Sequence, residues 1–83
     1  MRYQELDTVV LNRDLPDYGL RKGDLGAVVQ VYEPDGLEVE FVTASGNTQA
    51  LLELRAADVR PTLASDLLAV RTVERAEPSA VLG

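Results

Sequence analysis

The chain contains neither cysteine nor histidine among its 83 residues, and it has no tryptophan. It therefore lacks the usual ligands of a zinc site, the thiolate nucleophile and the commonest general base. A Ser-His-Asp triad is excluded for the same reason, and no disulfide can reinforce the fold. We expect no catalytic residue, no bound metal and no cofactor. The core must come from the 46% of residues that are hydrophobic.

Basic residues are also scarce, with 8 against 14 acidic residues and a net charge of −6. Such a surface repels nucleic acids and anionic membranes, and it suits a basic protein partner. The alternative is that the charge serves solubility alone. No run approaches the roughly 20 apolar residues of a membrane span, and the N-terminus lacks the apolar stretch of a signal peptide. We expect a cytoplasmic protein.

Five short segments have the character of β-strands. Residues 37–43 alternate apolar and acidic side chains, which is the period of a strand with one buried face. Residues 8–11 and 25–33 are rich in valine, and turn residues at 34–36 and 45–47 indicate an antiparallel meander. Residues 48–55 are a strand or a helix, and one helical turn at 56–58 leads to a last strand at 59–61.

This pattern predicts a mainly all-β domain over residues 1–61, a small SH3-like five-stranded barrel, closed or half-closed. Closure would remove sheet edges that invite aggregation. The expected core consists of Val9, Leu11, Val29, Val31, Leu37, Val39, Phe41, Leu52, Leu54 and Val59.

Residues 62–83 form a C-terminal extension of different character. A helix of about three turns, at 3.6 residues per turn, would place Leu63, Leu67, Val70 and Val73 on one side. Asp66 interrupts that stripe, and a strand is the alternative. We favour the helix. A barrel this small leaves little core for these side chains, so we expect a homodimer through residues 63–73.

A long loop, residues 12–24, joins the first two strands and contains Asp14, Asp17 and Asp24. These carboxylates could hold a hard cation, but their spacing fits no EF-hand, and accepting hydrogen bonds within turns is the simpler interpretation. Gly23 indicates a left-handed turn. Gly26 indicates a bulge or a close backbone approach at a corner of the barrel.

The candidate partner-binding residues are Tyr18, Arg21, Lys22, Tyr32, Glu38 and Glu40. The first three share the long loop, and tyrosine and arginine dominate binding hot spots. Tyr3 is a further aromatic candidate. As alternatives, Tyr18 packs with Leu15 and Leu20 as a lid on the barrel, and Lys22 is a Schiff-base nucleophile or a solvated charge. The two glutamates alternatively form an ordinary wet sheet face.

A string of short motifs resembles one bacterial family. The motifs are Leu6–Leu11, Asp14-Leu15-Pro16, Gly19-Leu20, Gly23–Gly26, Val28–Tyr32, Val39-Glu40-Phe41 and Asp58-Val59-Arg60. They resemble the domain of unknown function 4926 over residues 5–61. The resemblance implies an SH3-like barrel, akin to KOW modules and to the small barrel of the nitrile hydratase beta subunit. It also makes an antitoxin or immunity role thinkable, because members look often to sit beside genes for toxin-like proteins.

We therefore predict a non-catalytic protein-binding module, an antitoxin-type partner or a small subunit of a larger assembly. Two alternatives remain. One is a KOW-like RNA-binding module that uses Tyr18 and the basic residues of the loop. The other is a metal-dependent enzyme that uses the loop carboxylates.

Overall fold

The computed structural model describes residues 3–73, which contain five strands and two single turns of 3-10 helix. The strands are β1 (Thr8–Leu11), β2 (Leu25–Tyr32), β3 (Gly36–Val42), β4 (Thr48–Arg55) and β5 (Val59–Pro61). The 3-10 turns are η1 (Pro16–Tyr18) and η2 (Ala56–Asp58). The mainly-β class, the five strands and the helical turn at 56–58 are thus confirmed, and 48–55 is a strand.

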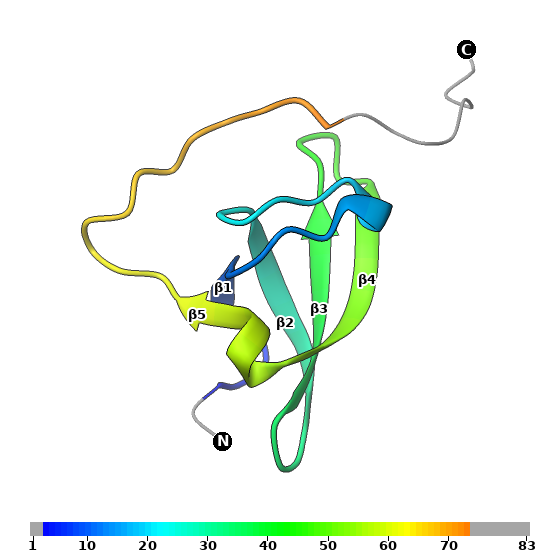
Figure 1. The fold of residues 1–83 in the computed structure, drawn as a ribbon, viewed down its shortest axis with the longest axis vertical. Helices are drawn as coiled ribbons and strands as arrows, with labels where there is room; N and C mark the ends of the chain where they lie inside the picture. The colour runs from blue at the N-terminus through cyan, green and yellow to red at the C-terminus, as the bar shows by residue number, and fades with distance from the viewer. Residues whose placement is uncertain (1–2, 74–83) are drawn as a thin grey trace.

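All strands belong to one antiparallel sheet in the order β4-β3-β2-β1-β5, which Figure 1 shows as a twisted, curled surface. The first four follow each other as neighbours, and β5 returns to pair with β1. Alternate residues of β3 lie on the buried face, as its period of two requires. The core cluster consists of Tyr3, Val9, Leu11, Leu15, Leu20, Val28, Leu37, Val39, Phe41, Ala50, Leu54 and Val59.

Seven of the ten expected core positions lie in the core cluster, Val31 and Leu52 are partly buried against it, and Val29 is wrong. Its side chain is 41% exposed, whereas Val28 is buried. The reason is a register shift between Val28 and Gln30 in the pairing of β2 with β3. An extra residue in a strand reverses the alternation beyond it, so Val28 and Val31 face the core instead of Val29 and Val31. Tyr3, the further aromatic candidate for an interface, is buried in the core cluster.

The sheet does not close into a barrel, which corrects the expectation of closure. β4 and β5 stand at its two ends and form no ladder with each other, although η2 connects them directly. β5 has only three residues and ends at Pro61, which has no N–H to donate to a further strand. The sheet curls around its core and leaves two edges.

The predicted C-terminal helix is wrong for the part of the extension that the structure describes. Residues 62–73 form no helix, and only a turn at 64–65 interrupts an irregular course. A helix of this length is marginal in water unless it packs against something, and this segment has no such support. The rest of the predicted extension, from residue 74, lies outside the described residues. Among residues 3–73, no helix is long and apolar enough to span a membrane.

Side chains of β3 pack directly against the backbone of β2 at Gly26. A Cβ atom at this position would lie 2.6 Å from Val39 Cγ1 and 2.8 Å from Phe41 Cε2. The close backbone approach expected at Gly26 is therefore confirmed, and the left-handed turn at Gly23 is confirmed by its φ of +99°.

Replacing Gly26 by alanine should lower the free energy of unfolding by about 1–3 kcal/mol, because the added methyl group overpacks the core. Urea titration of both proteins measures the difference. Ala27→Val on the neighbouring exposed position is the matched control and should change stability by less than about 0.5 kcal/mol. Equal stability of Gly26→Ala and the parent chain would contradict the packing described here.

Candidate functional site

The loop between β1 and β2 is an ordered cap on the core. Leu15 and Leu20 pair through two backbone hydrogen bonds of 3.0 and 3.1 Å, and η1 fills the space between them. Both leucines are buried, which confirms that they form a lid. Tyr18 does not join them, because its side chain is 49% exposed. The Gln49 side chain fastens the lid to β4 by donating Nε2–H to the carbonyl oxygen of Tyr18 at 3.1 Å.

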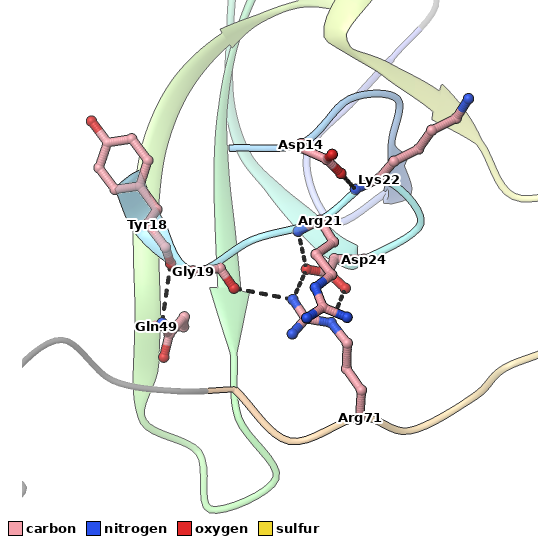
Figure 2. A network of polar contacts seen from close by, with 8 residues as sticks. All are labelled: Asp14, Tyr18, Gly19, Arg21, Lys22, Asp24, Gln49 and Arg71. Atoms are coloured by element: carbon pink, nitrogen blue, oxygen red, sulfur yellow. Dashed lines mark hydrogen bonds and ion pairs between the residues drawn. The ribbon is translucent and has the colours of Figure 1, made fainter. Parts of the chain in front are cut away.

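Two aspartates shape the second half of this loop by accepting backbone hydrogen bonds. Asp14 Oδ1 accepts from the N–H of Lys22 at 2.8 Å, and Asp24 Oδ2 accepts from the N–H of Arg21 at 2.7 Å. Figure 2 shows both carboxylates directed at the loop backbone. The turn-forming interpretation is confirmed for Asp24, which closes the turn that begins at Arg21, whereas Asp14 accepts from a residue eight positions away and joins two parts of the loop. Only the backbone N–H groups of Arg21 and Lys22 take part in these hydrogen bonds, and the side chains of both residues are exposed.

Asp24 also binds a residue that the sequence did not single out. Arg71, from the C-terminal extension, donates Nε–H to Asp24 Oδ1 at 2.9 Å and Nη2–H to Oδ2 of the same carboxylate. The same Nη2 donates to the carbonyl oxygen of Gly19 at 3.0 Å. In Figure 2 the guanidinium of Arg71 reaches from the extension to the loop. Such a two-point arginine–carboxylate pair fixes geometry as well as charge.

Partial burial would raise the pKa of Asp24, but the hydrogen bonds and charges around it outweigh that effect. Arg71 contributes the largest opposing interaction, followed by the N–H of Arg21, and the pKa is lowered below its ordinary value of 3.8. Asp24 is therefore ionised throughout the physiological range and anchors the extension to the loop.

A second ion pair fixes the start of the extension. Arg60, at the end of the sheet, donates to both carboxylate oxygens of Asp66 at 2.9 and 3.0 Å. Asp66 also accepts the N–H of Leu63 at 2.7 Å, which closes the turn after β5. The guanidinium of Arg60 and this N–H both lower the pKa of Asp66. The extension is thus attached at two points, Asp66 and Arg71.

The outer face of the sheet carries a row of carboxylates. Glu38 on β3 stands directly opposite Glu53 on β4, and Gln30 on β2 is its neighbour on the other side. Glu40 lies two residues further along β3 on the same face and accepts the hydroxyl of Thr48 at 2.6 Å. Within residues 3–73, none of these three glutamates has an ion-pair partner.

Tyr32 completes this outer face. Its hydroxyl donates to Glu38 Oε1 at 3.5 Å. Desolvation and the negative charges of Glu38 and Glu53 raise the pKa of Tyr32 above its ordinary value of 10.0, so the phenol keeps its proton and its role as a donor. We call Tyr32, Glu38, Glu40 and Glu53 the acidic face.

The six residues predicted for partner binding therefore fall into two groups. Tyr32, Glu38 and Glu40 lie together on the acidic face, whereas Tyr18, Arg21 and Lys22 lie on the loop, and within residues 3–73 no hydrogen bond joins the two groups. Figure 2 shows the hydroxyl of Tyr18 directed away from Arg21 and Lys22. No set of three carboxylates within residues 3–73 comes close enough to hold a metal ion.

Three residues with a part in these surfaces were missed. The place of Glu53 beside Glu38 could not be predicted, because it depends on the strand register, which the sequence does not show. Arg60 and Arg71 belong to segments whose apolar residues carried the prediction. The one available signal was the position of Arg71 as a lone cation within an otherwise uncharged stretch, residues 67–73.

These features define a small antiparallel β domain with a capped core, an acidic outer face and a tethered extension. The family model described as Domain of unknown function (DUF4926) matches residues 5–61, and the chain belongs to this family. No curated protein and no solved structure matches the chain. The match ends where β5 ends, so the extension that carries Arg71 lies outside it.

Replacing Asp24 by asparagine should lower the free energy of unfolding at neutral pH by about 1 kcal/mol, because it removes a partly exposed ion pair. Since the folded pKa of Asp24 is lowered, this contribution is present above about pH 4 and is lost as the pH falls through the folded pKa. Urea titrations of both proteins across this pH range should therefore converge in acid.

Asp17→Asn is the matched control, since Asp17 is exposed in η1 and forms no ion pair within residues 3–73. It should leave stability within about 0.5 kcal/mol of the parent at every pH. A stability difference for Asp24→Asn that stays constant down to the lowest pH would contradict the role of its charge.

Proposed function

We propose that this chain is a non-catalytic protein-binding module whose acidic face binds a basic surface of another protein. The observation that carries the proposal is the pairing of Glu38 with Glu53. Two like charges directly opposite each other on neighbouring strands destabilise a sheet. A partner that brings lysine or arginine between them removes that repulsion on binding, and so the pair favours the complex over the free domain.

The surroundings of the pair fit this role. Tyr32 places an aromatic ring with a hydroxyl donor beside Glu38, and tyrosine is among the residue types that dominate binding hot spots. Thr48 restrains the carboxylate of Glu40 through its hydroxyl. The face rests on regular strands above a packed core, so it presents its carboxylates in a fixed arrangement. Charge of one sign on such a face also accelerates encounter with an oppositely charged partner.

Two finer assignments belong to the same proposal. The five-stranded sheet, in which β5 returns to β1, supports an SH3-like domain of which the edge between β4 and β5 stays open. An antitoxin or immunity function, in which the basic partner is a toxin-like protein, follows from the family resemblance alone.

RNA binding has less support than protein binding. It would require the ring of Tyr18 to stack on a base while Arg21 and Lys22 contact phosphates. The tyrosine instead points away from both cations. The net charge of −6 also opposes any approach of a phosphate backbone.

Replacing Glu38 by glutamine should have opposite effects on stability and binding. Stability should rise by a few tenths of a kcal/mol because the repulsion with Glu53 is removed. Capture of the partner from a lysate of the native host should fall, and the salt sensitivity of what remains should weaken. Urea titration and affinity capture with quantitative mass spectrometry measure the two effects on the same preparations.

Glu33→Gln is the matched control, because Glu33 is an exposed acid in the turn between β2 and β3 and makes the same change of charge. It should retain every specific partner of the parent chain. Glu40→Lys should lose them. Capture that is identical for Glu40→Lys and Glu33→Gln, or the absence of any specific protein partner, would refute the proposal.

A further inference from the structure

The strand β4 is an open edge of the sheet. It is eight residues long and pairs with β3 on one side, and no strand of the described residues lies on its other side (Figure 1). Within residues 3–73, no backbone-to-backbone hydrogen bond outside the ladder with β3 involves Thr48–Arg55. The opposite edge, β5, has only three residues and ends at Pro61. Of the two edges, β4 is therefore the one that can accept a further strand.

The strand register shows which residues of β4 present open backbone groups. The N–H of Ala56 donates to the carbonyl oxygen of Asp35 at 2.8 Å, and this pair continues the register of β3 with β4. Opposite residues of an antiparallel ladder alternate between bonded and non-bonded pairs. Counted back from Ala56, Leu51 and Glu53 belong to the non-bonded pairs. Their N–H and C=O groups therefore point away from β3, toward the open edge.

This open part of β4 has a defined beginning and end. Arg55 donates its N–H to Asp58 Oδ2 at 2.8 Å, so that donor is already used. At the other end, a register shift leaves Gln49 without an opposite residue on β3. Leu51 and Glu53 are thus the residues in the regular part of β4 that a partner strand can pair with.

The side chains of the same two residues indicate which strand fits. Leu51 and Glu53 lie on the outer face, opposite Glu40 and Glu38 of β3. Both are exposed, and Leu51 leaves 51% of its surface open to solvent. A strand added antiparallel to β4 places one side chain beside each of them, two residues apart on one face. A basic side chain beside Glu53 then reaches toward Glu38, and an apolar side chain covers Leu51.

A second copy of this chain fits the edge less well than a basic strand. Two copies of β4 paired about a twofold axis would form one continuous sheet, with both acidic faces on the same side. Arg55 is the only basic residue of β4, and its guanidinium already pairs with Asp35 at 3.2 Å. A second copy would therefore add carboxylates to the acidic face without a free cation to offset them.

We propose that β4 binds its partner by strand addition, in which an extended segment of another protein pairs antiparallel with Leu51 and Glu53. The segment carries a basic side chain beside Glu53 and an apolar side chain, two residues away, beside Leu51. This inference rests on the proposed function and adds the form of the partner, an extended strand. Its main chain supplies the hydrogen bonds, and its alternate side chains provide the selectivity.

A synthetic peptide tests strand addition on the parent chain itself. The probe Thr-Lys-Thr-Val-Thr-Lys-Thr places lysine and valine two residues apart on one face, and its sequence is the same in both directions. At about millimolar concentration it should shift the backbone amide resonances of Leu51 and Glu53 in a saturable titration. The same peptide with glutamate in place of lysine should not bind. The absence of any saturable shift with the lysine peptide would refute strand addition.

Two N-methylated forms of the lysine peptide separate strand pairing from the attraction of charge. A methyl group on the valine nitrogen removes a donor that faces β4, whereas one on the nitrogen of the central threonine after it removes a donor that faces solvent. The first should weaken binding by about tenfold, as expected for the loss of one hydrogen bond, and the second by less than about twofold. Equal affinities of the two forms would contradict strand addition.

The corresponding change in the chain is Leu51→Pro, which removes the outward N–H. Proline is tolerated on an edge strand where its nitrogen faces solvent, so circular dichroism should match that of the parent. Leu51→Ala is the matched control, because it shortens the same side chain and keeps the N–H. The lysine peptide should bind Leu51→Pro about tenfold more weakly than Leu51→Ala. If Leu51→Pro does not fold, the two N-methylated peptides on the parent chain decide the question.

Capture from a lysate of the native host separates this inference from the proposed function. A basic partner that binds the parent chain should be lost with Glu40→Lys and also with Leu51→Pro, and retained by Leu51→Ala. A partner that is lost with Glu40→Lys but retained by a folded Leu51→Pro would bind the acidic face without strand addition. That result would overturn the inference and leave the proposed function standing.

Discussion

Gly26 has no side chain, and a side chain at this position would collide with Val39 and Phe41. Much of the architecture depends on the close contact between β2 and β3 that this glycine permits. A single sheet can enclose a core only if it bends over itself, and a long strand bends where a glycine or a bulge allows it. β2 has both, with Gly26 near its start and a register shift after Val28. Through them, the same strand pairs with β1 at one end and with β3 along its length.

The curled sheet leaves one end of the core uncovered, and the loop after β1 closes it. Leu15 and Leu20 supply the apolar contact, while Asp14 and Asp24 satisfy the backbone of the loop that carries them. Asp24 has a further role, because its carboxylate also holds Arg71. One aspartate therefore links the lid and the extension, so the position of the extension depends on the loop being folded.

The acidic face and the extension differ in chemistry. The acidic face is built on paired strands and holds Glu38 opposite Glu53, so it is rigid and carries excess negative charge. Residues 67–70 of the extension are apolar and lie between two arginine–aspartate pairs, Arg60 with Asp66 and Arg71 with Asp24. In the proposed function, a basic partner complements the acidic face.

Local sequence determined the strands, because alternation along residues 37–43, valine-rich runs and turn residues act over neighbouring positions. It also determined the constrained sites at Gly23 and Gly26, since only glycine fits a left-handed turn or a backbone contact of this kind. Only the tertiary structure decided the rest. The bulge that buries Val28 in place of Val29, the register that sets Glu53 beside Glu38, and the reach of Arg71 to Asp24 all join residues distant along the chain. No local pattern records such pairings, because they depend on how the whole sheet curls.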